Sequence, residues 1–325
     1  MAEDNILIDV QNLTKHFPIR RGIIFERITG SVQAVDKISF TIRRGETLGM
    51  VGESGCGKTT LARVILGLMP ATSGHVYFDG EDVCSLKGEK LRLLRKDMQL
   101  VFQDPYASLN PRMTVEAIVR TPMKAFNLYS NAEQKEKVGE ILNTVGLTDF
   151  HAKRYPHQFS GGQRQRIGVA RALAASPKFI IGDEPVSALD VSIRGQVLNL
   201  LKDLQDEFHL TYLFISHDLS VVQHVSDRVA VIYLGKLMEL ATGDDLYREP
   251  LHPYTQALLA AVPPPSPRAR RTERVVIHGE TPSPANPPSG CRFRTRCPKA
   301  IVECAEIEPP LKEERPGHVV ACIRV

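Results

Sequence analysis

Short apolar runs alternate with amphipathic stretches along this chain of 325 residues. The runs at residues 47–51, 179–181 and 211–216 are mostly apolar, which is typical of parallel strands buried on both faces. A further strand-like run, at residues 98–105, ends in Asp-Pro, which marks a turn. Helical spacing of apolar residues follows at 61–68 and again between Ile167 and Ala174. This order predicts an α/β fold with a central, mainly parallel sheet.

The composition limits the classes of function. Hydrophobic residues make up 42% of the chain and charged residues 24%, which is ordinary for a globular protein. No uncharged apolar run approaches the roughly 18–20 residues needed to span a bilayer, and the acidic start MAEDNILIDV is not a secretion signal, so we expect a cytoplasmic protein. The net charge of +4 is too small to favour nucleic acid as a partner. The basic stretch at residues 264–299 contains one Phe and no Tyr or Trp, which is too few for the stacking surface that binding of single strands would require.

The segment GESGCGKTT fits a phosphate-binding loop, G-x-x-x-x-G-K-[ST], between a strand and a helix. Its glycines would let backbone N–H groups turn toward phosphate oxygens at the start of the helix. Lys58 would neutralise the β and γ phosphates, and the hydroxyl of Thr59 would bind the Mg²⁺ that bridges them. The predicted nucleotide-binding residues here are Gly52, Glu53, Ser54, Gly55, Cys56, Gly57, Lys58, Thr59 and Thr60.

Two adjacent acids end the apolar run in KFIIGDEP. Asp183 would hold Mg²⁺ through water, and Glu184 would act as a base for, or orient, the water that attacks the γ phosphate. Gln103, at the end of its own strand-like run, could sense the metal and the water. Thr59, Gln103 and Asp183 are thus the predicted contacts of Mg²⁺. His217 follows the last apolar run and could contact the γ phosphate from the opposite side.

A second phosphate-binding helix start lies in QFSGGQRQR, residues 158–166. Ser160 would cap the helix and leave N–H groups of the next residues exposed. One ATP uses one phosphate loop, so this second start must serve another nucleotide or another subunit. Its predicted residues are Ser160, Gly161, Gly162 and Gln163.

Together these motifs resemble those of the ATP-binding subunits of ABC transporters. The match covers nearly all of residues 1–262, with Phe159 in the signature FSGGQ where leucine is usual. The resemblance implies an ABC-type P-loop ATPase with a RecA-like core, an antiparallel β subdomain and a helical subdomain at about residues 104–177. It also implies catalytic roles for Glu184, His217 and Gln103. The D-loop of the family would be Ser187, Ala188, Leu189 and Asp190.

In that family two ATPase subunits pack head to tail, and each ATP lies between one phosphate loop and the partner's signature. This arrangement would explain the second helix start. An aromatic residue from the N-terminal strands stacks on adenine in these proteins, and Phe17 occupies the matching place here. Phe17 could equally be a core residue.

Residues 263–325 narrow the subfamily. The string HPYTQALLAAVP, followed by a Pro-rich stretch and cysteines, resembles the ATPases of oligopeptide and dipeptide importers. Eight prolines between residues 263 and 288 predict an extended linker. The resemblance implies a peripheral location on the cytoplasmic face of the membrane. Its implied partners are a second ATPase, commonly a different chain, two transmembrane permease subunits and an extracytoplasmic substrate-binding protein.

Four cysteines cluster beyond the linker, separated by five, six and seventeen residues: Cys291, Cys297, Cys304 and Cys322. In a cytosolic chain such a cluster favours a metal over disulfides. The gaps are wider than those of structural zinc sites, so a 4Fe–4S cluster is the first choice, and peptide-importer ATPases are expected to carry one. Zinc and unligated thiols are the alternatives. Neighbouring basic residues would lower the pKa of the thiols, namely Arg292, Arg294, Arg296 and Lys299.

Two other hypotheses remain open. A soluble ABC protein of translation would generally carry two ATPase units in one chain, and one of DNA repair would separate its motifs by long coiled coils; neither pattern occurs here. The importer could also carry nickel, glutathione or short sugars, because cargo is chosen by the binding protein and the membrane subunits.

Overall fold

A computed structural model describes residues 5–21, 27–261 and 279–325 of the chain. The chain forms two compact units. The first unit comprises Met1–Leu7, Ile42–Thr47 and Ser85–Ile215, and the second comprises Ile8–Thr41, Leu48–Cys84 and Ser216–Val325. Most of the predicted linker, residues 262–278, lies outside the described residues. Among the helices that the structure describes, none has the length and apolar character needed to cross a bilayer.

Three parallel strands form the centre of the first unit. They are β6 (Met98–Val101), β7 (Phe179–Asp183) and β8 (Thr211–Ile215), with β7 between the other two. Phe179, Ile180 and Ile181 are at most 1% exposed, as expected for a strand covered on both faces. The three predicted strands of this unit are therefore confirmed, and their carboxyl ends share one edge of the sheet.

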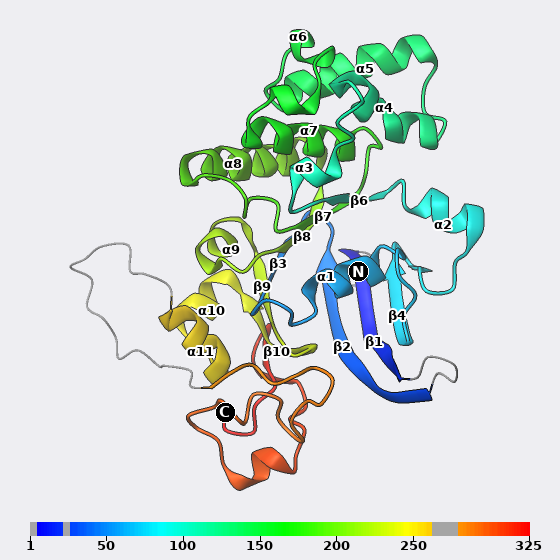
Figure 1. Cartoon of the computed structure of the whole chain (residues 1–325). Helices are drawn as coiled ribbons and strands as arrows, with labels where there is room; N and C mark the ends of the chain where they lie inside the picture. The colour runs from blue at the N-terminus through cyan, green and yellow to red at the C-terminus, as the bar shows by residue number, and fades with distance from the viewer. Residues whose placement is uncertain (1–4, 22–26, 262–278) are drawn as a thin grey trace, which may run out of the picture. The chain divides into compact units, whose positions relative to one another are not determined.

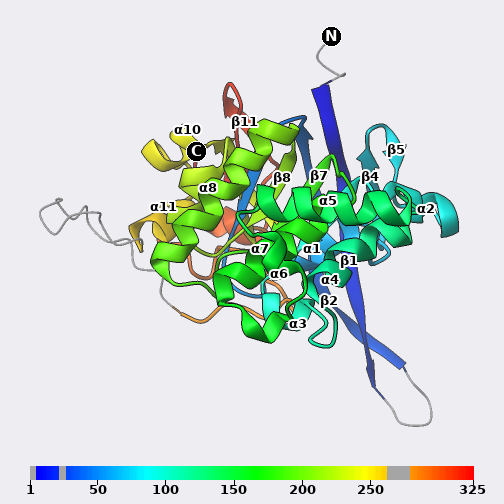
Figure 2. The same cartoon turned by 90° about the horizontal axis from the view of Figure 1, so that it is seen from above.

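Helices make up most of the rest of the first unit: α2 (Gly88–Leu94), α3 (Pro105–Ser108), α4 (Val115–Ala125), α5 (Asn131–Thr144), α6 (Asp149–Ala152), α7 (Gly161–Leu173) and α8 (Val191–Phe208). Helix α4 packs against α5, α6 and α7, and these helices gather together in green in Figure 1. Figure 2 shows α5 and α7 side by side. Val115, Val119 and Met123 recur at helical spacing and are buried, so α4 turns an apolar stripe toward its neighbours.

An antiparallel sheet lies largely in the second unit. Its order is β2 (Arg27–Arg43), β1 (Ile6–Arg21), β4 (Ser73–Phe78) and β5 (Glu81–Asp82). Strand β4 pairs antiparallel with both β1 and β5. The antiparallel N-terminal sheet predicted from the family resemblance is thus present.

A second group of strands in this unit carries the nucleotide-binding motif. Strand β3 (Thr47–Val51) is parallel to β9 (Arg228–Tyr233), which is antiparallel to β10 (Lys236–Thr242). The helices are α1 (Lys58–Ile65), α9 (Leu219–Val225), α10 (Gly243–Arg248) and α11 (Pro253–Ala260). The C-terminal strands β11 (Lys312–Arg315) and β12 (His318–Val320) continue the same sheet, because β12 pairs with β10. The C-terminal strands therefore belong to the second unit, together with the phosphate loop.

A buried carboxylate fastens the C-terminal strands to β10. Glu239 is fully buried and accepts hydrogen bonds from the N–H groups of Leu251 and His252, at 2.7 and 3.0 Å. It is also hydrogen-bonded to Nε2 of His318, at 2.7 Å. Burial lowers the pKa of His252 to about 4, and Nδ1 of this neutral ring accepts the N–H of Tyr254 at the start of α11. Each buried polar group left unpaired would cost about 1–3 kcal/mol. The network therefore favours the observed placement of these segments around Glu239.

Candidate functional site

The phosphate loop, residues 52–60, follows β3 and ends in the first turn of α1, as predicted. Gly57 is the N-cap of α1 with φ 108°, and no side chain caps the helix, so its first N–H groups are available to an anion. A Cβ at Gly57 would lie 1.9 Å from the carbonyl oxygen of Ala34. A Cβ at Gly52 would lie 2.1 Å from that of Ile232. Only glycine fits at these two positions, because both have a positive φ and a close backbone neighbour.

The lysine of the loop is buried and held by main-chain carbonyl groups. Its Nζ donates to the carbonyl oxygens of Gly52, at 2.6 Å, and Glu53, at 3.0 Å. Cys56 is buried beside it, and burial raises the pKa of its thiol, so this cysteine is a small packing group. Ser54 and Gly55 are exposed at the tip of the loop. Thr59 and Thr60 are half-buried in the first turn of α1.

The predicted catalytic acid and glutamine meet in the first unit. Nε2 of Gln103 donates to Oε2 of Glu184 at 2.9 Å. Glu184 has φ 50°, an uncommon conformation for a residue other than glycine, and its N–H donates to the carbonyl of Ile215 at 2.9 Å. Such backbone strain gathers at functional sites. The strained backbone and the 2.9 Å contact single out Glu184 at the end of β7, directly after the half-buried Asp183.

The signature segment, residues 160–163, forms the predicted helix start. The hydroxyl of Ser160 accepts the N–H of Gln163 at 3.3 Å, and the side chain of Gln163 accepts the N–H of Ser160 at 3.1 Å. This capping box satisfies two N–H groups of α7 and leaves those of the two glycines between them. Gly162 has no room for a Cβ, which would lie 2.3 Å from Cγ2 of Ile193 on α8.

The predicted D-loop lies next to this helix start in the same unit. A Cβ at Gly161 would contact Cδ2 of Leu189 at 3.4 Å. The hydroxyl of Ser187 donates to the carbonyl of Glu184 at 3.0 Å, which ties the loop to the catalytic candidate. Ala188 is exposed, and Asp190 is the N-cap of α8. The D-loop residues therefore connect the end of β7 with the signature segment.

His217 and Phe17 belong to the second unit, like the phosphate loop. His217 is exposed in the turn between β8 and α9. Phe17 is half-buried rather than enclosed in the core, and Nζ of Lys15 lies 5.1 Å from its ring centroid. Gln103, Asp183, Glu184 and the signature segment belong to the first unit.

Two contacts of the phosphate loop were not foreseen from the sequence. The hydroxyl of Tyr254 accepts the N–H of Glu53 at 3.0 Å. Nη1 of Arg296 donates to both carboxylate oxygens of Glu53, at 3.0 and 2.8 Å. The pairing of Arg296 with Glu53 spans 243 residues, so no local pattern in the sequence could have shown it.

The predicted metal site of the C-terminal cysteines is not supported. The four thiols are close enough to interact electrostatically, and the N–H of Cys291 donates to the carbonyl of Cys304 at 2.9 Å. In the described ranges, however, no group of three or more His, Cys, Asp or Glu side chains is placed to hold a metal ion. The side chains as they stand do not surround a common centre.

Of the four basic residues predicted to lower the pKa of these thiols, only Lys299 does so, and the net shift is upward. Burial raises the pKa of Cys291 to about 11 and also raises the pKa of Cys297 and Cys322. Two arginines are paired elsewhere, Arg292 with Asp36 and Arg296 with Glu53. The other two basic residues also have partners, since Arg294 donates to Ser289 and Lys299 donates to Gln256. Lys299 lowers the pKa of Cys297 and Cys322, but burial outweighs it.

Residues 35–187 match the family described as ABC transporter, and residues 238–304 match the family described as oligopeptide/dipeptide transporter, C-terminal region. The chain is 56% identical over 323 residues to the oligopeptide transport ATP-binding protein AppF of Bacillus subtilis, covering 99% of this chain and 98% of that protein. It is 53% identical over 318 residues to a putative peptide import ATP-binding protein of Brucella ovis, with 98% of each chain covered.

Two solved structures are also similar to this chain in fold. The dimeric post-hydrolysis structure of the ATP-binding cassette MJ0796, bound to ADP and Pi, is similar with a TM-score of 0.63 and 29% identity. The similarity covers 73% of this chain and 98% of that one. The structure of cbiO1 from Clostridium perfringens, part of the ABC transporter complex cbiONQ, has a TM-score of 0.65 and 25% identity, over 75% of this chain and 92% of that one.

Proposed function

This chain belongs to the ATP-binding subunits of ABC transporters, in the oligopeptide and dipeptide importer group, and we propose that its hydrolysis of ATP drives import of short peptides. The observation that carries this proposal is the similarity over 99% of the chain, which includes the C-terminal region as well as the ATPase motifs. Nickel, glutathione and short sugars are the alternative cargoes, since the ATPase does not bind the cargo itself. Nothing in the comparisons favours a soluble ABC protein.

The phosphate loop would bind the nucleotide. Its glycines present N–H groups to the phosphates, and Lys58 would move from the carbonyls of Gly52 and Glu53 to the phosphate oxygens. Thr59, Gln103 and Asp183 offer hydroxyl, amide and carboxylate oxygens, the donors that Mg²⁺ prefers. Mg²⁺ held by these three groups would offset the negative charge of the β and γ phosphates. Phe17, half-buried beside Lys15, would stack on the adenine.

Glu184 would orient the attacking water and accept its proton. The Gln103 amide holds one carboxylate oxygen at 2.9 Å, which orients the carboxylate as a base or water-orienting group requires. His217, exposed in its turn, would contact the γ phosphate. That Glu184, His217 and the phosphate loop act on one nucleotide is an inference from family membership.

The signature segment would bind the ATP of a second ATPase subunit. Its helix start has the free glycine N–H groups that a phosphate requires. Closure of the two ATPase subunits on ATP, followed by hydrolysis and reopening, would move the membrane subunits. We further propose that the partner ATPase is a different chain and that two permease subunits hold this chain at the cytoplasmic face of the membrane. An extracytoplasmic protein would deliver the cargo.

These partners can be tested directly. Tagged chain purified in mild detergent from its native membranes is expected to bring down one further ATPase and two membrane subunits, identified by mass spectrometry. The same preparation from cytosol after membrane removal is the control and should lack them. A complex without any membrane subunit would contradict the importer assignment and favour a soluble ABC protein.

We also propose that the four C-terminal cysteines bind a 4Fe–4S cluster. Its support is the electrostatic interaction among the four cysteines and the backbone N–H groups of Phe293, Lys299 and Arg324, which donate to the sulfurs of Cys291, Cys297 and Cys322. Cysteines lose their protons when they bind a metal, so ligation would lower the pKa values that burial raises in these thiols. Ligation would also require the side chains to turn toward a common centre.

Metal analysis decides between the alternatives. Chain purified without oxygen is expected to contain about four irons and four sulfides, the composition of such a cluster. The Cys297→Ser variant should lose most of the iron and its visible absorption, whereas Cys84→Ser, outside the cluster, should not. Zinc without sulfide would favour the zinc alternative, and metal-free protein would leave the cysteines as thiols.

A further inference from the structure

One segment of the C-terminal region, residues 291–297, is anchored on an aromatic cluster beside the phosphate loop. Phe293 is fully buried, with its ring centroid 5.3 Å from that of Tyr233 and 5.2 Å from that of Tyr254. Tyr233 ends β9, and Tyr254 lies in the first turn of α11. Because aromatic contacts at these distances fix ring positions, the arginines on either side of Phe293 are held in place.

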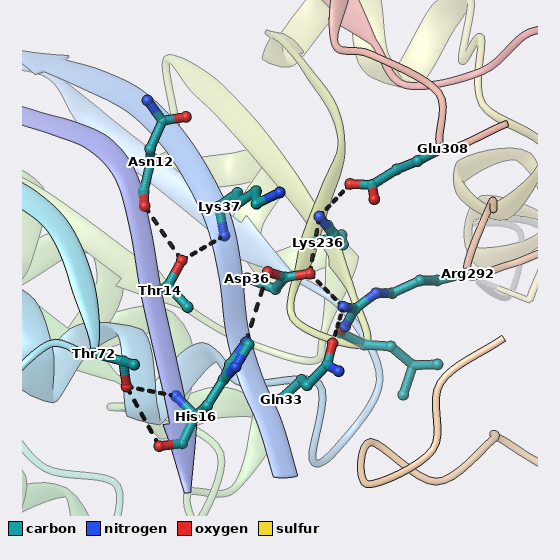
Figure 3. A network of polar contacts seen from close by, with 11 residues as sticks. Asn12, Thr14, His16, Gln33, Asp36, Lys37, Thr72, Lys236, Arg292 and Glu308 are labelled. Atoms are coloured by element: carbon teal, nitrogen blue, oxygen red, sulfur yellow. Dashed lines mark hydrogen bonds and ion pairs between the residues drawn. The ribbon is translucent and has the colours of Figure 1, made fainter. Parts of the chain in front are cut away.

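Arg292 contacts the phosphate loop indirectly, through the turn at Leu234 and Gly235. Arg292 donates to the carbonyl of Leu234 and to the carboxylate of Asp36. Figure 3 shows Arg292 and Lys236 on one side of Asp36. The next residue of the turn, Gly235, donates its N–H to the carbonyl of Cys56 in the phosphate loop at 2.8 Å. Arg292 thus supports the turn that contacts the loop.

The Asp36 carboxylate stays ionised in this network. Burial by itself would raise the pKa of Asp36, but the hydrogen bond and charge of Lys236 and the charge of Arg292 lower it. Nζ of Lys236 lies 2.9 Å from Asp36. Opposite charges that are both partly desolvated make a directed contact, so the network fixes the position of residues 291–297 relative to Asp36 and Lys236 in the same unit.

The second arginine acts on the loop itself. Nη1 of Arg296 contacts both carboxylate oxygens of Glu53, and the hydroxyl of Thr281 donates to one of them at 2.7 Å. The side chain of Arg296 is 9% exposed and that of Glu53 is 24% exposed. The N–H of Glu53 donates to Tyr254 and its carbonyl accepts from Lys58, so every polar group of Glu53 has a partner. Three of the partner residues come from the C-terminal part of the chain: Tyr254, Thr281 and Arg296.

An acidic residue at this position needs such a partner. The phosphate loop binds an anion, and an uncompensated carboxylate in the loop would repel it in a setting of reduced solvent screening. Arg296 neutralises Glu53, and its guanidinium holds the carboxylate in one orientation. The same contact ties the loop to a segment that begins and ends in cysteines of the C-terminal group, Cys291 and Cys297.

We propose that Arg296 is a positioning residue for ATP, which neutralises Glu53 in the phosphate loop and makes nucleotide affinity depend on the docked C-terminal segment. This inference rests on the proposed function, because it requires that residues 52–60 bind ATP. Arg296 would not contact the nucleotide itself. It acts through Glu53, so its loss should weaken binding of ATP and leave turnover at saturating ATP unchanged.

The test is a set of MgATP affinities measured by calorimetry on the full chain. Arg296→Ala is expected to raise the Kd for MgATP about tenfold, which corresponds to about 1.4 kcal/mol. Adding Glu53→Gln to Arg296→Ala should bring the Kd back to within about threefold of Glu53→Gln alone, because the unpaired charge is then absent. Arg294→Ala is the matched control in the same segment, where Arg294 donates to Ser289, and should bind as the wild type does.

Further variants distinguish a failure of the proposed role of Arg296 from a failure of the proposed ATP site. Thermal unfolding of each variant shows that it is folded, and if Arg296→Ala does not fold, Arg296→Gln replaces it with the same expectation. Wild-type affinity in the Arg296 variant, while Lys58→Ala loses binding, would overturn the positioning role alone. If the double variant with Arg296→Ala and Glu53→Gln binds MgATP as weakly as Arg296→Ala alone, the proposed neutralisation of Glu53 would be overturned. Unchanged binding by Lys58→Ala would instead overturn the assignment of the ATP site.

Discussion

Replacing Glu184 with glutamine is expected to reduce ATP hydrolysis by at least about 10²-fold while MgATP binding is retained, since general-base catalysis contributes about 10²–10⁴ in rate. Glutamine preserves the size of the side chain and its acceptor for Gln103, which lies 2.9 Å from Glu184. It cannot take a proton from water. The positive φ of Glu184 shows that the backbone holds this side chain in an unusual direction, as a positioned catalytic group requires.

The measurement is steady-state hydrolysis by the assembled complex, together with ATP affinity of the same sample. Glu207→Gln, an exposed exchange of the same kind on α8, is the matched control and should hydrolyse ATP at the wild-type rate. The Glu184→Gln complex should also accumulate with ATP in a closed form. Hydrolysis at an undiminished rate would remove Glu184 from its proposed role.

Replacing Lys58 with alanine is expected to weaken MgATP binding by about a hundredfold or more. A charged hydrogen bond is worth about 1.5–3 kcal/mol, and Lys58 would make such bonds to two phosphates. The substitution also removes the bonds that hold Gly52 and Glu53, at 2.6 and 3.0 Å, so the loop itself would lose support. Both effects lower affinity.

Equilibrium binding of a fluorescent ATP analogue to the isolated chain measures this loss. Lys202→Ala, which removes an exposed lysine from α8, provides the comparison and should leave binding as it is. Thermal unfolding without nucleotide would show that both variants are folded. Tight binding by a folded Lys58→Ala variant would show that residues 52–60 do not cradle the phosphates.

The elements that carry the ATPase motifs could be predicted from the sequence because their signals are local. The apolar runs at 47–51 and 179–181 became β3 and the buried part of β7, and Ser160 caps α7 as expected. Periodicity, glycine position and capping depend on neighbours a few residues apart. The contact of Gln103 with Glu184 was not itself predicted, but both residues were placed at the ends of strand-like runs, and parallel strands bring their carboxyl ends to one edge.

The organisation of the C-terminal region could not be predicted in the same way. Arg292 and Arg296 lie beside cysteines in the sequence, which suggested that their charges serve the thiols. In the structure they pair with Asp36 and Glu53, 256 and 243 residues away. Burial then dominates the pKa of Cys291 and raises it. Which carboxylate an arginine meets depends on the tertiary fold, and adjacency in the chain is a poor guide to it.

We propose that this chain hydrolyses ATP to drive the import of peptides. ATP hydrolysis is to be measured with the complex purified from native membranes, with its binding protein and a panel of peptides, nickel and glutathione. We expect that short peptides stimulate hydrolysis, that nickel and glutathione do not, and that Glu184→Gln abolishes the stimulated rate. Stimulation by nickel or glutathione with no response to any peptide would contradict the peptide assignment.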